Sequence, residues 1–268
     1  MELYFTDSIP KILLYDIEIS YIEGWVWRPY GEDMTPRRII KDWFVMSWAA
    51  KWLGEDKIMY ASQSKKSKNE MRNDKGILKG LWKLVNSADI VITFNGKKFD
   101  QKKINTRFII NGMKPTITAK HIDVYKILKE KFGFTSNSME NVAKDLGLEP
   151  KYKHKNFDGD NMWTECLKGN QEAWAEMEIY NKQDVTLLEQ IYNIIIPWDN
   201  SVNFNLYNDD TINTCKCGST TFTRNGFKYL AKGKYQRYVC TKCGAESRSH
   251  KNLLSKKKIK SLTMKVTE

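Results

Sequence analysis

Five residues have the types and local spacing that could assemble a metal centre for phosphoryl chemistry: Asp16, Glu18, Asp100, Tyr180 and Asp184. Asp16 and Glu18 follow an apolar run that predicts a buried strand, and side chains two apart on a strand leave the same face. Tyr180 and Asp184 are four apart in a helical pattern, so they lie roughly 6 Å apart on one helix face. Clustered carboxylates repel unless cations join them. Two divalent cations about 4 Å apart would do so, and that arrangement performs in-line cleavage of phosphodiester bonds.

The elements that must position these residues follow from hydrophobic periodicity. Residues 12–18 predict the first strand, and residues 88–95 predict a second strand that runs through a glycine turn into a helix over 98–111, which carries Asp100. Residues 171–196 predict the long last helix, which Pro197 ends. The remaining expected elements are strands near 24–27, 43–52 and 57–60, an exposed loop at 62–73, a helix at 76–86, an element that begins at 121–125 and runs into 126–132, and a helix to Leu146 capped by Ser136 or Asn137.

Three motifs in the chain together resemble one family: Asp16-x-Glu18, Asn95-Gly96-x-x-Phe99-Asp100 and Tyr180-x-x-x-Asp184. They are similar to those of the DEDD superfamily of 3′→5′ exonucleases, in its tyrosine-bearing subclass. They occur in the family's order, across roughly residues 8–197. The resemblance implies an α/β ribonuclease H-like fold, in which helices flank a mixed sheet. One departure is Ile19, where many relatives have a threonine that contacts substrate.

The resemblance also implies a set of ligands for two catalytic metal ions. Asp16, Glu18 and Asp184 would hold the ion that binds the attacking water. Asp16 would bridge to the second ion, which Asp100 would support through water and which would stabilise the leaving 3′ oxygen. Ligand sets made only of oxygen suit Mg²⁺ or Mn²⁺.

Three further residues have roles implied by the same resemblance. Tyr180 would position the attacking water, because a phenol with a pKa of about 10 is a weak base at pH 7. Asn95 would contact the terminal nucleotide of the substrate or shape the turn, and Phe99 would pack under the site or insert near the terminal base. These residues complete the predicted catalytic and substrate-binding set of the main domain.

Two pairs of cysteines near the C-terminus have the spacing of a metal site. Cys215 and Cys217 precede Cys240 and Cys243, with an expected hairpin between the pairs, so we predict one structural Zn²⁺. A segment of about 40 residues cannot build a stable apolar core, and a metal would take its place. Two disulfides are the alternative, which the missing secretory signal disfavours. The fifth cysteine, Cys166, is expected to be a small buried apolar residue.

Charge is concentrated in the same region. Of 44 basic and 32 acidic residues, residues 211–268 contain 14 basic and two acidic ones, so the entire net charge of +12 lies there. Such an asymmetry indicates a segment that binds a polyanion, although a lysine-rich tail can also serve solubility alone. The segment around Cys240 is similar to the zinc ribbons of transposases and other DNA-handling proteins. The residues expected to contact nucleic acid there are Arg224, Lys228, Lys234, Tyr235 and Arg237.

Size and composition set the domain organisation. A chain of 268 residues with 41% hydrophobic content can form one sizeable core and a small appendage. We predict an exonuclease domain at 1–198, a linker at 199–213, the zinc ribbon at 214–250 and a basic tail at 251–268. We find no apolar run of transmembrane length and no signal peptide, so we expect an intracellular protein, cytoplasmic in location.

The sequence therefore favours a metal-dependent 3′→5′ exonuclease whose zinc ribbon binds the substrate. DNA is preferred over RNA as the substrate because of the ribbon's resemblance. Proofreading would require a polymerase or repair protein as partner, since no polymerase domain accompanies the core, and free-standing end trimming, repair or nucleotide recycling are equally open. Two alternatives stay open: a structure-specific or transposase-like endonuclease, and a nucleic-acid-binding protein without catalysis.

Overall fold

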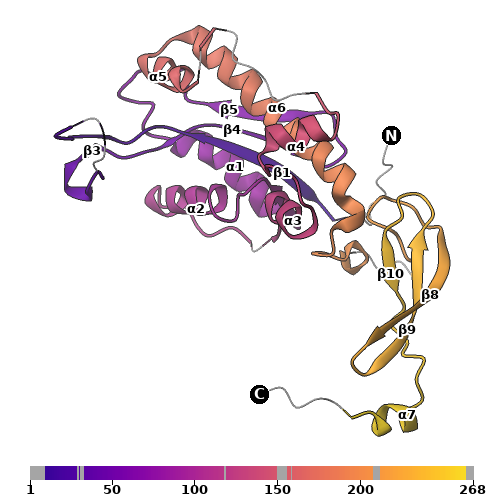
Figure 1. Cartoon of the computed structure of the whole chain (residues 1–268). Helices are drawn as coiled ribbons and strands as arrows, with labels where there is room; N and C mark the ends of the chain where they lie inside the picture. The colour runs from indigo at the N-terminus through magenta and orange to yellow at the C-terminus, as the bar shows by residue number, and fades with distance from the viewer. Residues whose placement is uncertain are drawn as a thin grey trace. The chain divides into compact units, whose positions relative to one another are not determined.

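A five-stranded sheet forms the centre of residues 10–192 in the computed structural model of the chain (Figure 1). The structure describes residues 10–28, 30, 33–117, 119–149, 156–157, 159–207 and 212–263. Residues from Asn193 onward belong to a second unit. Among the described residues, none of the helices combines the length and apolar character that a membrane crossing requires.

The central sheet mixes parallel and antiparallel pairs. Its strands are β1 (Ile12–Ile19), β4 (Val45–Trp52), β5 (Ile58–Ser62), β6 (Ile90–Thr93) and β7 (Lys120–Asp123). Their order across the sheet is β5-β4-β1-β6-β7, with β4 antiparallel to both β1 and β5 and with β6 parallel to both β1 and β7. The predicted mixed sheet of an α/β fold is confirmed.

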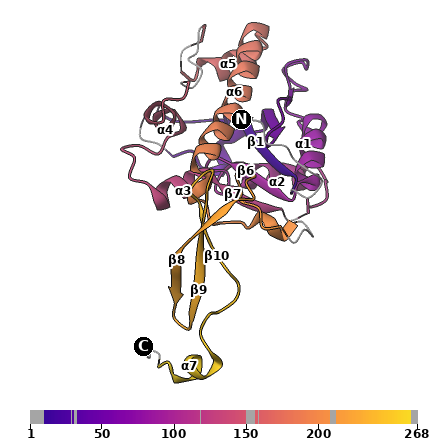
Figure 2. The ribbon, with the colours of Figure 1, turned by 90° about the vertical axis from the view of Figure 1, so that its right-hand side faces the viewer.

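One face of the sheet is covered by α1 (Lys75–Ser87) and α2 (Asp100–Ile110) (Figures 1 and 2). Leu78, Leu81 and Val85 of α1 recur at helical spacing, and all three are buried against apolar residues of β1 and β4. Each such buried side chain contributes roughly 2 kcal/mol. This apolar layer packs against β1 on the face of the sheet opposite the candidate site. Helix α3 (Val124–Lys131) follows β7 directly.

The opposite face is covered by α5 (Asn161–Lys168) and α6 (Gln171–Ile195). Phe44 and Met46 point to this side, where they pack with Cys166 of α5 and with Trp174 and Met177 of α6. Cys166 is fully buried in this layer, as expected for a small apolar residue. Both views show α6 running along the sheet on the side away from α1 and α2 (Figures 1 and 2).

Three local expectations needed correction. Helix α4 (Met139–Asp145) is capped by Ser138, whose hydroxyl accepts a hydrogen bond from the backbone of Asn141, rather than by Ser136 or Asn137. The strand expected at 24–27 is only β2 (Glu23–Gly24), because the residues after it expose their side chains. Helix α5 was not foreseen, since its apolar spacing covers only two turns.

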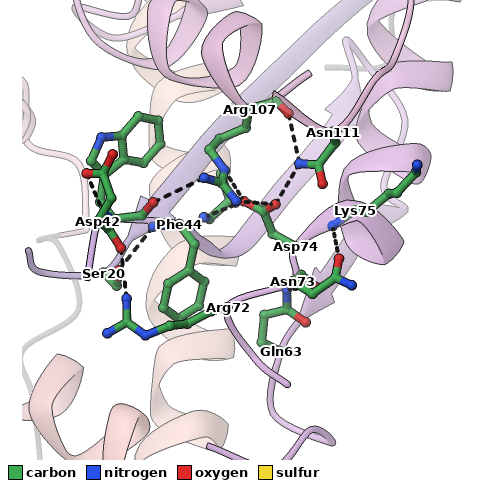
Figure 3. A network of polar contacts seen from close by, with 12 residues as sticks. Ser20, Asp42, Phe44, Gln63, Arg72, Asn73, Asp74, Lys75, Arg107 and Asn111 are labelled. Carbon is green, nitrogen blue, oxygen red and sulfur yellow. Dashed lines mark hydrogen bonds and ion pairs between the residues drawn. The ribbon is translucent and has the colours of Figure 1, made fainter. Parts of the chain in front are cut away.

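A buried charge network ties α2 to the strands and to the segment before α1 (Figure 3). The Asp74 carboxylate is fully buried and accepts hydrogen bonds from Arg107 Nε (2.7 Å) and Nη2 (2.8 Å), from Asn111 Nδ2 (2.9 Å) and from the Val45 backbone (3.0 Å). Both carboxylate oxygens are satisfied, and the guanidinium binds them as a fork. This geometry allows a full charge to sit inside the fold.

Replacing Arg107 with leucine is expected to destabilise the chain by about 3–5 kcal/mol, because the Asp74 carboxylate stays buried without its cation. Urea unfolding followed by tryptophan fluorescence measures this, since Trp198 is the one tryptophan of nine beyond residue 192. Lys126→Leu is the control. It breaks an exposed ion pair with Glu130, and a loss of less than about 1 kcal/mol is expected. Equal losses in both variants would contradict a stabilising role for the buried pair.

The second unit contains a three-stranded antiparallel sheet, with strand order β10-β9-β8. Its elements are η2 (Ile196–Trp198), η3 (Phe204–Tyr207), β8 (Phe222–Leu230), β9 (Gly233–Cys240), β10 (Glu246–Arg248) and α7 (Lys256–Ser261). Strands β8 and β9 form the hairpin that the sequence predicts between the two cysteine pairs. Within the tail predicted from residue 251 onward, Ser255 caps the short helix α7.

Candidate functional site

Strand β1 presents two carboxylates to one face of the sheet. Asp16 and Glu18 alternate with Tyr15 and Ile17, and these two are buried in the apolar layer on the α1 side. The carboxylates therefore point to the face that α6 covers. Both are partly exposed, so solvent and substrate can reach them.

Helix α6 brings a third carboxylate to the same place. The oxygens of Asp16, Glu18 and Asp184 lie within 4.8 Å of one another. Asp184 is 5% exposed, so its charge lies in an environment where repulsion from its neighbours is poorly screened. Three carboxylates at this spacing can hold a divalent cation, and oxygen donors are those that Mg²⁺ and Mn²⁺ prefer.

A buried amide fixes the orientation of the Asp16 carboxylate, and we did not predict it from the sequence. Asn181 is fully buried and donates from Nδ2 to Asp16 Oδ2 at 2.7 Å. Its own carbonyl oxygen accepts a hydrogen bond from the Ser47 hydroxyl on β4 at 3.2 Å. The Ser47 contact sets which end of the amide faces Asp16. Asn181 lies three residues before Asp184, so helical spacing alone places both on the same face of α6.

Replacing Asn181 with alanine is expected to weaken Mn²⁺ binding by about 10–100-fold, because groups that orient metal ligands typically contribute that much. Isothermal titration of Mn²⁺ into the full chain measures the change. Gln190→Ala, on the exposed side of the same helix, is the matched control and should bind as the wild type does. An unchanged affinity in Asn181→Ala would show that Asp16 needs no external support.

Asp100, predicted as a fourth metal ligand, is not one of the three described residues whose oxygens all lie within 4.8 Å of one another. It is the first residue of α2 and is 4% exposed. Burial raises the pKa of its carboxyl group from 3.8 to about 7, and the nearby charge of Asp123 adds to this rise. A cation bound beside Asp100 would favour its ionised form. Its role as a ligand stays a prediction.

The turn between β6 and α2 sets the position of Asp100. Asn95 has a positive φ of 60°, and a Cβ on Gly96 would meet Thr93 Oγ1 at 2.2 Å and Asp100 Oδ2 at 3.0 Å, so glycine is required there. Asp123 holds the turn from β7, because its carboxylate accepts hydrogen bonds from the Asn95 backbone at 2.9 Å and the Lys97 backbone at 3.3 Å.

Of the other predicted residues of this domain, Phe99 is exposed, and Asn95 and Tyr180 are partly exposed. The Tyr180 ring packs edge-on against Trp163 of α5, with centroids 5.6 Å apart. Phe99 immediately precedes α2, is 41% exposed and lies 5.7 Å from the Lys103 ammonium. Lys103 also lies 3.9 Å from the centre of the Trp43 ring, an aromatic contact that the sequence did not indicate. The assigned roles of Asn95, Phe99 and Tyr180 in substrate binding or catalysis stay predictions.

The four cysteines of the second unit form one cluster, in which all sulfurs lie within 4.8 Å of one another. Cys215 Sγ is 3.5 Å from Cys243 Sγ, and Cys217 Sγ is 3.6 Å from Cys240 Sγ. A disulfide would need about 2.05 Å, whereas sulfurs around a tetrahedral zinc ion lie about 3.8 Å apart. The cluster can therefore hold a metal ion.

Contacts within the second unit anchor the first cysteine pair. Lys216, between the two cysteines, donates a hydrogen bond to the Asp199 backbone oxygen at 2.5 Å and pairs with its carboxylate at 3.0 Å. The Asn205 side chain bonds both the backbone nitrogen and the backbone oxygen of Thr214, each at 2.7 Å. Residues of the predicted linker 199–213 thus hold the start of the cysteine segment.

The residues predicted to bind nucleic acid in this unit lie on β8 and β9. The register pairs Lys228 with Tyr235, so the two side chains share a face of the hairpin. Arg224 is exposed, and Lys234 lies 4.0 Å from the centre of the Phe227 ring. Arg237 donates a hydrogen bond to the Asn225 backbone at 2.6 Å. Their contacts with nucleic acid stay predictions.

A family model described as the RNase_H superfamily matches residues 48–196, more than half of the chain. The match includes Asp100, Tyr180 and Asp184, and Asp16 and Glu18 lie before it. No curated protein matches the chain. Among solved structures, the chain is similar to the family B DNA polymerase from the hyperthermophilic archaeon Pyrobaculum calidifontis, with 14% sequence identity and a TM-score of 0.48. The similarity covers 85% of this chain and 32% of that polymerase chain, so this chain spans about a third of its length.

The family match confirms the ribonuclease H-like fold that the sequence motifs predict. The tyrosine-bearing exonuclease subclass and the zinc ribbon stay predictions. Because the family model matches more than half of the chain, the chain belongs to the RNase_H superfamily.

Proposed function

We propose that this protein is a 3′→5′ exonuclease that depends on Mg²⁺ or Mn²⁺ and hydrolyses the phosphodiester bonds of DNA in preference to RNA. The observation that carries the proposal is the convergence of Asp16, Glu18 and Asp184 in a member of the RNase_H superfamily. These carboxylates come from two elements far apart in the sequence. Mutual repulsion would oppose this placement unless cations bind there.

The residues of the site would have different roles in hydrolysis. When bound, the divalent cations activate water and stabilise the leaving oxygen. Asp16, Glu18 and Asp184 would hold the cations, with Asp100 as a further acid near a second ion. Asn181 keeps the Asp16 carboxylate oriented toward them. Tyr180 would hold the attacking water by a hydrogen bond from its hydroxyl group.

The position of Tyr180 supports an exonuclease rather than a strand-transfer enzyme. Tyr180 and Asp184 lie four residues apart on α6, on the same helix face. This pair is what the resemblance to the tyrosine-bearing subclass rests on, and strand-transfer enzymes of related fold use a different carboxylate triad. The endonuclease alternative is kept as an outcome of the test.

The second unit is proposed to be a zinc ribbon that binds the nucleic acid. Its four cysteine sulfurs are spaced for a tetrahedral Zn²⁺. The 14 basic residues after position 210 would neutralise phosphates, so affinity should fall as salt rises. The metal would give the ribbon its fold and the cations would give it affinity for substrate.

The proposal is tested with matched DNA and RNA oligonucleotides labelled at the 5′ end. The full chain is incubated with Mg²⁺, with Mn²⁺ and without added metal, and Asp16→Ala serves as the inactive control. A ladder of products that shortens from the 3′ end, absent without metal and in the variant, is the expected result. A discrete internal cut would indicate an endonuclease. Binding without cleavage under any metal would contradict enzymatic function.

A further inference from the structure

The segment between β1 and β4 exposes an unusual amount of aromatic surface. We call the described residues 23–28, 30 and 33–41 the aromatic hairpin; it contains β2 (Glu23–Gly24), η1 (Pro36–Arg38) and β3 (Ile39–Lys41). Trp25 is 72% exposed, Trp27 is 88% exposed and Tyr30 is 84% exposed. Large apolar rings that cluster at the surface mark sites of interaction, whereas single exposed ones are ordinary.

The base of the aromatic hairpin is fixed by hydrogen bonds and ion pairs. Within it, Trp25 donates its backbone N–H to the Arg38 oxygen at 2.9 Å. A Cβ on Gly24 would lie 2.7 Å from that same oxygen, so the two arms of the hairpin approach closely at a glycine. Arg72 pairs with the Glu23 carboxylate and donates to the Asp42 backbone oxygen at 2.8 Å. The rings are therefore presented on a folded base, which lowers the entropy lost when a partner binds.

This base lies at the end of the strand that carries the metal-site carboxylates. Ser20 lies two residues after Glu18; it donates its backbone N–H to the Phe44 oxygen at 3.0 Å and accepts the Phe44 N–H through its hydroxyl at 3.1 Å. Figure 3 shows Ser20, Phe44 and Arg72 side by side. In Figure 1 the β3 segment reaches away from the sheet past the strand ends. The hairpin therefore extends outward from the candidate site.

The composition of the hairpin fits a nucleic acid strand. Residues 25–38 contain three arginines, Arg28, Arg37 and Arg38, against Glu32 and Asp33, so the segment carries a net positive charge. Its exposed rings are tryptophan and tyrosine, whose flat faces stack with any base. A duplex hides the faces of its bases, whereas a single strand exposes them, so the chemistry selects unpaired nucleotides.

We propose that Trp25, Trp27 and Tyr30 form a stacking site for the unpaired bases of a single-stranded nucleic acid whose end occupies the acidic site. The inference rests on the proposed function for the identity of the ligand. The stacking site would bind the substrate outside the metal site and would make the protein prefer single strands, which the metal site alone does not explain. The site lies wholly within residues 10–192 and is separate from the ribbon's binding residues in the sequence.

The test measures binding of the full chain, without added divalent cation, to a fluorescently labelled single strand of about 20 nucleotides and to a blunt duplex of the same length. The variants are Trp25→Ala/Trp27→Ala and the stacking-competent Trp25→Phe/Trp27→Phe. The matched control, Ile109→Ala/Ile110→Ala, removes two exposed apolar side chains from α2. We expect the alanine variant to bind the single strand at least about tenfold more weakly, with the duplex affinity unchanged. The phenylalanine variant and the control should bind as the wild type does.

Three outcomes would overturn the stacking site. The alanine variant could bind the single strand as tightly as the wild type, or lose single strand and duplex equally. The third is self-association through the hairpin, detected as a dimer of the wild type that the alanine variant lacks on size-exclusion chromatography. Because this assay requires no hydrolysis, absence of cleavage under every metal would remove the proposed function without deciding the binding result.

Discussion

Replacing Asp184 with asparagine is expected to reduce hydrolysis of a single-stranded oligonucleotide by at least about 10³-fold, equivalent to about 4 kcal/mol of the activation barrier. The amide has nearly the shape of the carboxylate, so the packing of α6 is kept while one anionic ligand of the three-carboxylate cluster is lost. Binding of the oligonucleotide should persist, because removing a negative charge from the site weakens its repulsion of phosphates. The measurement compares single-turnover cleavage with affinity on the same substrate.

The control for this prediction is Glu172→Gln, which removes one negative charge from an exposed position in the first turn of the same helix. It should cleave at the wild-type rate. If Asp184→Asn keeps activity within tenfold of the wild type, the cluster formed with Asp16 and Glu18 is not the catalytic centre. A parallel loss in both variants would point to a charge effect on substrate binding.

Replacing Cys240 with serine is expected to abolish zinc binding and to unfold the ribbon. Among the described residues from 212 to 263, the buried ones are Cys217, Gly233 and Cys240. Two of these three are metal-ligand candidates, so this part of the chain has no apolar core that would stabilise it without the metal. Structural zinc sites contribute apparent binding free energies of about 10–16 kcal/mol at pH 7. Loss of one thiolate should therefore remove most of what holds β8 and β9 together. Native mass spectrometry should find one zinc per wild-type chain and none in the variant.

Nucleic acid affinity gives a second readout of the same change. Cys240→Ser should bind a long oligonucleotide more weakly and with a shallower salt dependence, since the basic residues of the hairpin lose their arrangement. Cys166→Ala is the matched control. That cysteine lies in the apolar layer of α5 and α6, so the variant loses core packing but should keep its zinc. A wild-type chain that binds no zinc, or a Cys240→Ser chain that keeps it, would contradict the site.

Local spacing was enough to predict the orientation of most candidate side chains. The alternation of Tyr15, Asp16, Ile17 and Glu18 placed the two acids on one face of β1, and the structure has them there because a strand repeats every two residues. The spacing of the cysteine pairs, with a hairpin between them, likewise indicated one cluster of four. In each case residues of a single strand or a single hairpin determine the geometry.

The contacts between elements were decided by the tertiary structure alone. Ser47 and Asn181 are 134 residues apart, and each looks like an ordinary polar residue in its own segment. Their link to Asp16 exists because β4 pairs with β1 in a register that sets Ser47 opposite Glu18, while α6 crosses that face. Strand register depends on the packing of both faces, which no single segment contains.

The burial of individual side chains was also decided by the tertiary structure. Asp100 is buried at the start of α2, and this burial raises the pKa of its carboxyl group, while its predicted role as a ligand stays a prediction. The sequence predicted a strand at residues 24–27, because aromatic residues favour strands. In the structure the side chains of Trp25 and Trp27 are largely exposed. Sequence thus determined the chemical groups and their local directions, whereas burial, which depends on all the neighbours at once, was decided by the fold.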